Sequence, residues 1–229
     1  MQALAELGFA VAVHCHRAVD EAAALAAEIE SGGGRAVVVE ADLADAATTA
    51  ALVDEAAAAL GGPLGMLVNN AAMFEPDRLA DFALERFRRQ LAVNLEAPLV
   101  LTKSFVRALP EAASGIVVNL GDQRTANPTA RYLGYSISKA GLAMASAVIA
   151  RDLAPRVRVN SIALGQALKA PGMDEAQFAR LVERTPLQRP TGLDEIAAAL
   201  RLIVQSPSMT GTTITLDSGM AMGWAYPER

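Results

Sequence analysis

The sequence is poor in the residues that disulfides and zinc sites require. It has one cysteine and two histidines among 229 residues, all within His14-Cys15-His16. A single cysteine cannot form an internal disulfide. Alternating residues of a strand point to opposite faces, so Cys15 would not join the two histidines at one metal ion. We therefore expect neither a disulfide nor a metal site.

The sequence also lacks the features of membrane and nucleic-acid-binding proteins. No apolar run approaches the ~20 residues of a membrane helix, and no charged-then-apolar leader opens the chain. The formal net charge is −5, which argues against a nucleic-acid surface. Hydrophobic residues make up 52% of the chain, enough for one large domain with a substantial core. We expect a single domain over residues 1–229 in a cytoplasmic protein with no nucleic-acid or membrane partner.

Short apolar runs alternate with helical patterns along the whole chain. We expect strands at residues 9–15, 35–40, 64–69, 116–120, 156–162 and 212–216. Helices are expected at 20–30, 46–60, 84–109, 173–183 and 193–205, with another from about Tyr135 to near Pro155. Nearly continuous apolar strands are typical of a parallel sheet with helices on both faces. The predicted fold class is α/β with a doubly wound parallel sheet.

Tyr135 and Lys139 stand four residues apart on a predicted helix, shortly after the strand at residues 116–120. This spacing puts both side chains on one face of the helix, one turn apart. A free tyrosine has a pKa of about 10, and a lysine cation beside it favours the phenolate and lowers that pKa. The pair is therefore a candidate acid/base unit, although the same spacing also occurs by chance on amphipathic helices.

Three further segments accompany this pair: a strand that ends in Asn69-Asn70-Ala71-Ala72, Asn94 within a long helical pattern, and a strand at residues 157–162. Together they resemble the short-chain dehydrogenase/reductase family over almost the whole chain. The resemblance implies a Rossmann-type fold and hydride transfer between a nicotinamide cofactor and a small-molecule substrate. It implies that Tyr135 protonates the reduced carbonyl or imine and that Lys139 holds the nicotinamide ribose. Asn94 would support a water chain that resupplies the proton, or would merely relieve a helix kink.

The loop after the strand at residues 9–15 bears on the choice of cofactor. Enzymes that prefer NAD carry an acidic residue near this strand end to bind the ribose 2′-hydroxyl, and none is present here. Arg17, together with His16, could instead pair with a 2′-phosphate through charge-assisted hydrogen bonds. This pattern predicts NADP(H) rather than NAD, the alternative for Arg17 being an ordinary solvated loop arginine.

Other cofactor contacts follow from the resemblance alone. It implies that Asp42 and the backbone of Leu43 hold the adenine, and that Asn70-Ala71 runs beside the adenine ribose. It also implies that Leu164-Gly165 lies near the nicotinamide, with leucine in place of the family's proline. Asp42 could in addition cap the helix that begins at residue 46.

The glycine-rich turn of the family, Thr-Gly-x-x-x-Gly-x-Gly, is absent from the sequence. That turn meets the cofactor phosphates at a helix N-terminus, and residues 1–4 look like the middle of the helix that should follow it. We therefore expect the chain to start about 15 to 20 residues late. The strand that is lacking would lie between those at 9–15 and 64–69, and their backbone groups would be unpaired. A mis-assigned start is the favoured explanation, with a fragment or a different gap-filling segment as alternatives, and weak cofactor binding and low stability are predicted.

Asp122 occupies the position, 13 residues before Tyr135 (135 − 122), where the family normally has serine. That exchange is typical of the pteridine reductase branch, and His14-Cys15-His16-Arg17 is similar to a motif of the same branch. Phe74 matches a phenylalanine that stacks on the pterin ring there, but it could also line a pocket for any apolar substrate. An aspartate could hydrogen-bond the amino and ring nitrogens of a pterin. The resemblance thus implies a pterin substrate, with a carbonyl reductase of another substrate as the alternative.

The assembly is also inferred from the resemblance. Two long helices of such proteins usually build a dimer interface and the dimers pair, so we expect a homotetramer. The apolar tail with Trp224 and Tyr226 is expected to pack at a subunit contact. A hypothesis of another class is a non-catalytic scaffold, which the missing turn favours. The presence of Asn94, Tyr135 and Lys139 favours the enzyme instead.

Overall fold

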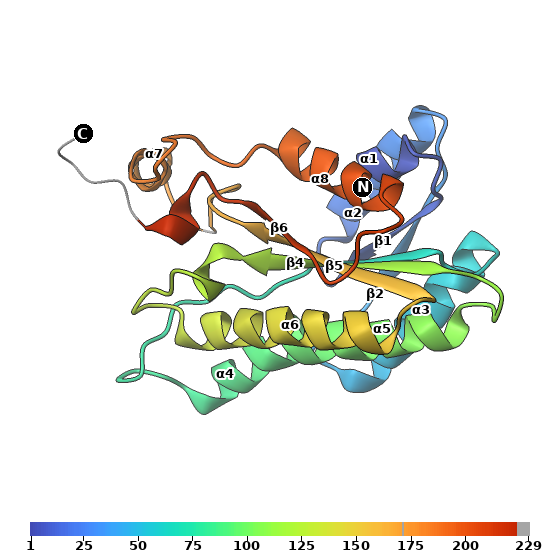
Figure 1. The fold of residues 1–229 in the computed structure, drawn as a ribbon, viewed down its shortest axis with the longest axis horizontal. Coiled ribbons are helices and arrows are strands. Elements are labelled where there is room, and N and C mark those ends of the chain that lie inside the picture. Colours follow the sequence, from blue (N-terminus) through green and yellow to red (C-terminus); the bar gives the residue numbers. More distant parts are fainter. Residues whose placement is uncertain (171, 224–229) are drawn as a thin grey trace.

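The computed structural model describes residues 1–170 and 172–223. Its strands are β1 (Val11–Cys15), β2 (Ala36–Glu40), β3 (Met66–Asn69), β4 (Gly115–Asp122), β5 (Val157–Leu164) and β6 (Thr213–Leu216). Its α-helices are α1 (Gln2–Ala5), α2 (Val19–Ser31), α3 (Ala46–Leu60), α4 (Leu84–Leu91), α5 (Ala97–Ala108), α6 (Leu133–Asp152), α7 (Glu175–Glu183) and α8 (Leu193–Gln205). Figure 1 shows α1, α2 and α8 on one side of the strands and α3 to α6 on the other. All strand pairs are parallel, which confirms the predicted α/β fold.

Local sequence signals explain where α3 begins and ends. The Asp45 carboxylate accepts a hydrogen bond from the Thr48 backbone N–H, and this satisfies a donor that the first turn leaves free. Gly61 follows the helix with φ of 73°, a left-handed conformation that glycine adopts without strain. Asp45 is therefore the cap of α3. The Asp42 carboxylate instead accepts from the backbone N–H of Ala44, so the capping role considered for Asp42 is not the one observed.

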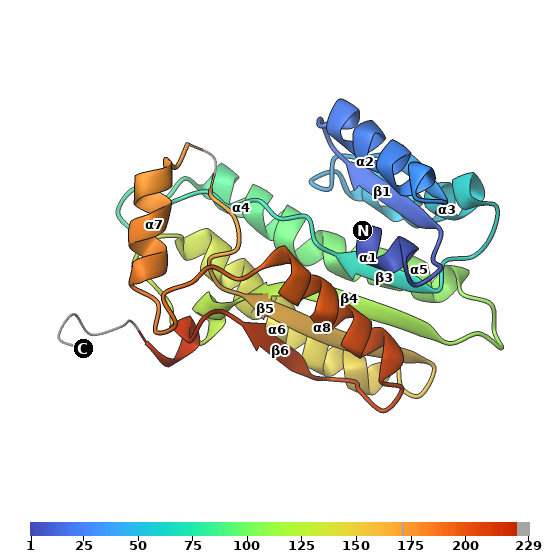
Figure 2. The same ribbon diagram turned by 90° about the horizontal axis from the view of Figure 1, so that it is seen from above.

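The strands form two sheets rather than one. β1 pairs with β2, and the other four strands run in the order β3-β4-β5-β6. β1 and β3 lie apart in Figure 2, and within residues 1–170 and 172–223 no strand pairs with either across that gap. A cavity of about 360 Å³ lies there, lined by mainly apolar residues of α1, β1, α3, β3, α5 and α8. The two strand edges that face this gap are those expected to lack a partner.

The core lies around β4, β5 and the long helix α6. Val118 of β4 and Ile162 of β5 are completely buried. By length and composition α6 could cross a membrane. However, it contacts β4, β5 and α4, and polar side chains such as Ser138 and Ser146 are buried within the domain. α6 is therefore the central helix of this fold.

The region expected to be one helix over residues 84–109 consists of three pieces. A π-helical segment, Ala92–Glu96, separates α4 from α5. Such a wider turn is frequent at functional sites, and here it contains the completely buried Asn94. The expected packing of Trp224 and Tyr226 lies outside the described residues.

Candidate active site

Three of the predicted site residues meet where β4 ends. Asp122 is the last residue of β4, and Tyr135 and Lys139 lie on the first turns of α6. The Tyr135 hydroxyl donates a hydrogen bond of 2.8 Å to Asp122 Oδ2. Lys139 Nζ donates a bond of 2.6 Å to the backbone carbonyl of Leu120, two residues before the aspartate on the same strand. All three side chains are almost fully buried, so their charges act in a medium of low polarity.

The electrostatics of this group differ from the expectation. Burial raises the pKa of Tyr135 well above its ordinary value, and the Asp122 carboxylate beside it raises the pKa further. Arg124 opposes this shift with its positive charge. The prediction that Lys139 lowers the pKa of Tyr135 is wrong for this structure, because desolvation and the neighbouring carboxylate outweigh a cation that bonds to Leu120. Burial in turn lowers the pKa of Lys139 to about 8, with the Asp122 charge acting in the opposite direction.

An arginine that sequence reasoning missed completes the group. Arg124 lies in the short 3₁₀ turn Gln123–Thr125. Its Nη1 is 3.2 Å from both carboxylate oxygens of Asp122, and its backbone N–H donates to Oδ1 of the same residue at 2.8 Å. Asp122 thus caps the turn, pairs with the guanidinium and accepts from the tyrosine. The sequence signal was available, since an arginine two residues after a strand-ending aspartate is close enough to pair with it.

Aromatic rings cover Tyr135. Phe74 packs edge-on against the Tyr135 ring with centroids 4.7 Å apart. On its other side Phe74 stacks on Tyr132 with centroids 4.3 Å apart and an interplanar angle of 9°. Tyr132 precedes α6 and has φ of 69°, an uncommon conformation for a bulky residue. The structure therefore places Phe74 against the Tyr135 phenol and adds Tyr132 as a second ring, while the stacking of Phe74 on a substrate stays a prediction.

Asn94 links α6 to the loop after β3. Its amide oxygen accepts from the backbone N–H of Met73 at 2.7 Å, and its nitrogen donates to the Met73 carbonyl at 2.9 Å. The same nitrogen also lies 3.0 Å from Ser138 Oγ. Asn94 occupies the centre of the π-helical segment, where the alternative role considered for it was to relieve a helix kink. Its contacts hold the segment that carries Phe74 against the helix that carries Tyr135.

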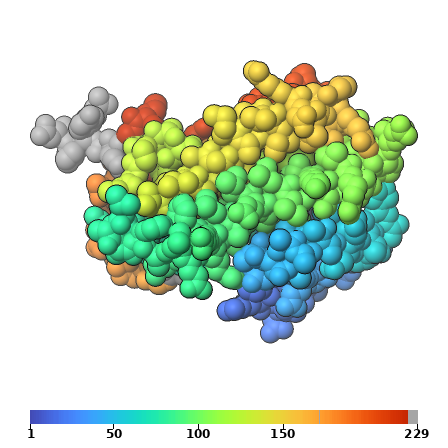
Figure 3. All heavy atoms as spheres, turned by 90° about the horizontal axis from the view of Figure 1, so that it is seen from below, coloured from blue at the N-terminus to red at the C-terminus, as the bar shows by residue number. Residues whose placement is uncertain are grey.

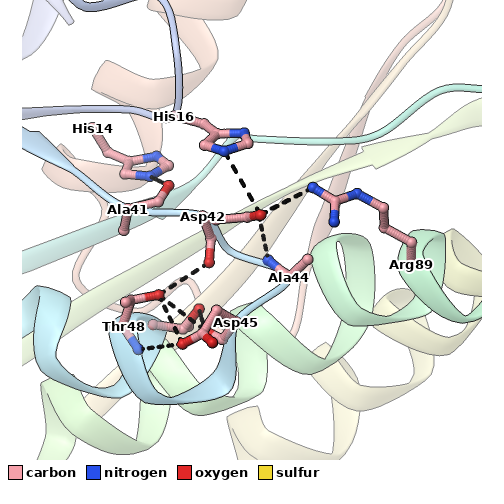
Figure 4. A network of polar contacts seen from close by, with 9 residues as sticks. His14, His16, Ala41, Asp42, Ala44, Asp45, Thr48 and Arg89 are labelled. Atoms are coloured by element: carbon pink, nitrogen blue, oxygen red, sulfur yellow. Dashed lines mark hydrogen bonds and ion pairs between the residues drawn. The ribbon is translucent and has the colours of Figure 1, made fainter.

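A second polar group lies at the ends of β1 and β2 (Figure 4). Asp42 Oδ2 is 3.0 Å from Arg89 Nη2 and 3.6 Å from His16 Nε2. The hydrogen bond from the Ala44 backbone is the main reason that the pKa of Asp42 lies below its usual range, and Arg89 adds to this effect. Arg89 of α4 was not among the predicted residues. His16 and Asp42, each predicted to contact the cofactor, lie side by side, whereas Arg17 is exposed after β1.

The remaining predicted residues lie in two other places. Leu43 is buried in the core, and Asn70 and Ala71 are exposed after β3, where they line the mouth of the cavity between the sheets. Leu164 ends β5, and Gly165 follows it against the backbone of Asp217. A Cβ at residue 165 would lie 2.7 Å from the Asp217 Cα, so only glycine fits this close approach. These predicted residues therefore lie at or just after the carboxyl ends of the strands in both sheets.

Comparison with known proteins adds to this geometry. Residues 1–178 match the family model for short chain dehydrogenases. The chain belongs to the short-chain dehydrogenase family. An oxidoreductase of Methylorubrum extorquens is 32% identical over 227 residues, which cover 96% of this chain and 90% of that protein. A 3-oxoacyl-[acyl-carrier-protein] reductase of Synechocystis is 29% identical and covers 96% of this chain and 90% of its own length.

Solved structures of the family share the same architecture. The FolM alternative dihydrofolate reductase 1 of Brucella canis, crystallised with NADP, is 38% identical with a TM-score of 0.93. The alignment covers 99% of this chain and 90% of that one. A short chain dehydrogenase of Burkholderia cenocepacia in complex with NADP is 32% identical with a TM-score of 0.84, covering 95% and 91% of the two chains. These likenesses confirm the family and the Rossmann-like fold.

The described residues fit a nicotinamide dinucleotide at its two ends but not at its middle. Tyr135 donates to Asp122 and Lys139 to the Leu120 carbonyl at the carboxyl edge of the sheet, where the nicotinamide would lie. At the other end, His16 and Arg89 add positive charge beside Asp42. Within the described part of the chain, no glycine-rich turn is available for the pyrophosphate. No group of three or more His, Cys, Asp or Glu side chains in that part could hold a metal ion.

Proposed function

We propose that this short-chain dehydrogenase reduces a C=O or C=N bond with NADP(H), and that the substrate is a pterin. The observation that carries the proposal is the bond between the Tyr135 hydroxyl and Asp122, with Lys139 one helical turn away. The NADP-bound relatives support the choice of cofactor, and one of them is named an alternative dihydrofolate reductase.

The chain's own residues supply a proton and an orientation. The bound cofactor would supply the hydride. A tyrosine of ordinary pKa, about 10, already holds its proton at neutral pH, so Tyr135 can act as a general acid toward the reduced oxygen or nitrogen. The raised pKa makes Tyr135 a weaker acid while its hydroxyl is bonded to Asp122. The resulting phenolate would lie beside the Asp122 carboxylate and would take its next proton from solvent. Lys139, whose Nζ is 5.8 Å from the centre of the tyrosine ring, is the cation that favours this transient anion.

Asp122 favours a pterin over a simple ketone. In the structure Oδ2 accepts the Tyr135 hydroxyl. When that hydroxyl turns to a substrate atom, Oδ2 loses a partner and can accept an N–H from a substrate ring or amino group. A pterin carries such N–H groups and a simple ketone does not. Phe74 and Tyr132, which stack on each other beside the same tyrosine, would supply aromatic surface for the substrate ring.

NADPH oxidation by the purified chain tests the proposal. Dihydrobiopterin, dihydrofolate and a simple quinone would be compared, each with NADPH and with NADH. We expect faster oxidation of NADPH than of NADH, and a higher kcat/KM for the two pterin-type substrates than for the quinone. Faster turnover of the quinone would favour the general carbonyl reductase. Absence of oxidation with any substrate would contradict the reductase and favour the non-catalytic scaffold, which the split sheet also supports.

We further propose a homotetramer in the cytoplasm. On α6, exposed apolar side chains recur on one face at Ile137, Met144 and Val148, and Leu99 of α5 is also exposed. Figure 3 shows α5 and α6 as one continuous surface, so a second copy could cover both helices. Light scattering tests this assembly, and a monomeric mass would contradict it.

A further inference from the structure

Arg124 has features that its pairing with Asp122 does not explain. Its side chain is 12% exposed, and its Nε is buried without a hydrogen-bond partner among the described residues. A charged donor left unsatisfied in the interior destabilises the fold more than a neutral one does. Buried polar groups of this kind are uncommon and call for an explanation. The position beside the proton donor points to a ligand as the missing acceptor.

We propose that Arg124 is a substrate-binding residue that donates a hydrogen bond from Nε to a carbonyl or ring nitrogen of a planar heteroaromatic substrate. Asp122 accepts the adjacent N–H of the same ring. This inference rests on the proposed reduction at Tyr135. It adds which hydrogen-bonding groups of the substrate ring the protein recognises.

The surroundings of the guanidinium fit a flat ring. Arg124 Cζ lies 5.2 Å from the centre of Phe74, 5.1 Å from that of Tyr132 and 6.0 Å from that of Tyr135. Cations at such distances are attracted to aromatic faces. The three rings and the guanidinium thus form one cluster around the tyrosine hydroxyl. A planar substrate that enters beside Phe74 meets the guanidinium at its edge.

The two charged groups present complementary hydrogen-bonding functions side by side. Asp122 only accepts hydrogen bonds when ionised, and Arg124 only donates. A ring with an N–H next to a C=O or a ring nitrogen, as in a 2-amino-4-oxopyrimidine, matches both at once. A quinone or simple ketone offers acceptors only, so it does not replace the hydrogen bond that Asp122 Oδ2 loses when Tyr135 turns to the substrate. Asp122 and Arg124 would therefore select substrates by the hydrogen-bonding groups on one side of the ring rather than by the size of the ring.

Equilibrium binding, measured with and without saturating NADP⁺, tests the inference. The probes are 2-amino-4-oxopteridine and unsubstituted pteridine, which share a ring system and differ in the recognised edge. The variants are Arg124→Met, which removes all donors, and Arg124→Lys, which keeps a positive charge facing Asp122 but lacks Nε. Arg131→Met is the matched control, because Arg131 also lies over Tyr132, at 5.7 Å, but is exposed.

We expect the wild type to bind the 2-amino-4-oxo compound at least about tenfold more tightly than pteridine. Arg124→Met and Arg124→Lys should both lose about tenfold for that compound and less than about twofold for pteridine, and Arg131→Met should bind both as the wild type does. Wild-type-like binding by Arg124→Lys would overturn the inference, since charge beside Asp122 would then suffice. Equal losses for both probes, or no wild-type preference between them, would overturn it as well. If Arg124→Met does not fold, the lysine variant decides. Selective binding without any NADPH oxidation would refute the proposed reduction and leave the role of Arg124 supported.

Discussion

The buried Lys139 predicts an unusual rise of stability with pH. Its side chain is 3% exposed, and burial lowers its pKa from 10.5 to about 8. Below pH 8 the lysine is protonated in both folded and unfolded chains, so it adds no pH dependence there. Between pH 8 and 10.5 the unfolded chain binds the proton and the folded chain does not. Stability therefore rises with pH in that window.

The size of this effect follows from the displaced pKa. Each pKa unit corresponds to about 1.4 kcal/mol, so the burial of charged Lys139 costs about 3 kcal/mol below pH 8. About 2 kcal/mol of that cost should be relieved between pH 8 and 10. Two other buried groups act in the opposite direction, since the pKa values of Cys15 and Tyr135 are raised and their folded forms retain protons at high pH. A comparison with a variant is therefore needed to isolate the lysine.

The contribution of Lys139 is isolated by comparing urea unfolding of the wild type and of Lys139→Met, both without cofactor. The methionine removes the titrating group and leaves the other groups in place. We expect the difference in unfolding free energy, wild type minus variant, to increase by about 2 kcal/mol from pH 8 to 10. A difference that stays constant or falls over this range would refute the argument, because Lys139 would then be as well solvated as in the unfolded chain.

Three further changes test other parts of the structure. Gly165→Ala should cost about 1–3 kcal/mol of stability in the same urea unfolding assay, because the new Cβ would meet the backbone of Asp217. Gly65→Ala is the control and should cost less than about 1 kcal/mol, because no atom lies within 4 Å of its Cβ position. Asn94→Ala should lower the unfolding free energy by about 1–3 kcal/mol, since it leaves the partly buried backbone N–H and C=O of Met73 unpaired, and an unchanged value would show that water replaces the amide. Met144→Asp places a charge at the exposed stripe of α6 and should yield a smaller particle by light scattering, and an unchanged mass would exclude this face from the interface.

The sequence predicts the secondary structure well where local signals are strong. The helix expected at residues 46–60 is observed as α3 with those bounds, since Asp45 and Gly61 mark its ends. The helix at 193–205 is likewise observed as α8. The strand at 116–120 is longer in the structure, Gly115–Asp122, because its pairing with β5 extends it beyond the apolar run. The single helix expected over residues 84–109 did not include the π-helical segment Ala92–Glu96, although the helix kink considered for Asn94 falls within it.

The sequence predicted which residues meet at the site but not the direction in which the pKa of Tyr135 is shifted. Tyr135, Lys139 and Asp122 meet as expected. The direction of the Tyr135 pKa depends on the rotamer that brings its hydroxyl to Asp122, and no spacing along the chain reveals that choice. Arg89 was missed for a similar reason, whereas the spacing of Asp122 and Arg124 along the chain could have revealed their pairing. Arg89 reaches Asp42 from a helix 47 positions away in the chain, and this contact exists only after the fold has formed.

The central claim is that Tyr135 gives the proton to the substrate. Its most direct test is the rate of NADPH oxidation by Tyr135→Phe, measured beside the wild type with dihydrobiopterin and accompanied by a thermal melt of both proteins. We predict a loss of turnover of about 10²-fold or more, the usual size of a general-acid contribution, in a variant that still folds. Turnover by the folded phenylalanine variant within about threefold of the wild type would contradict the claim.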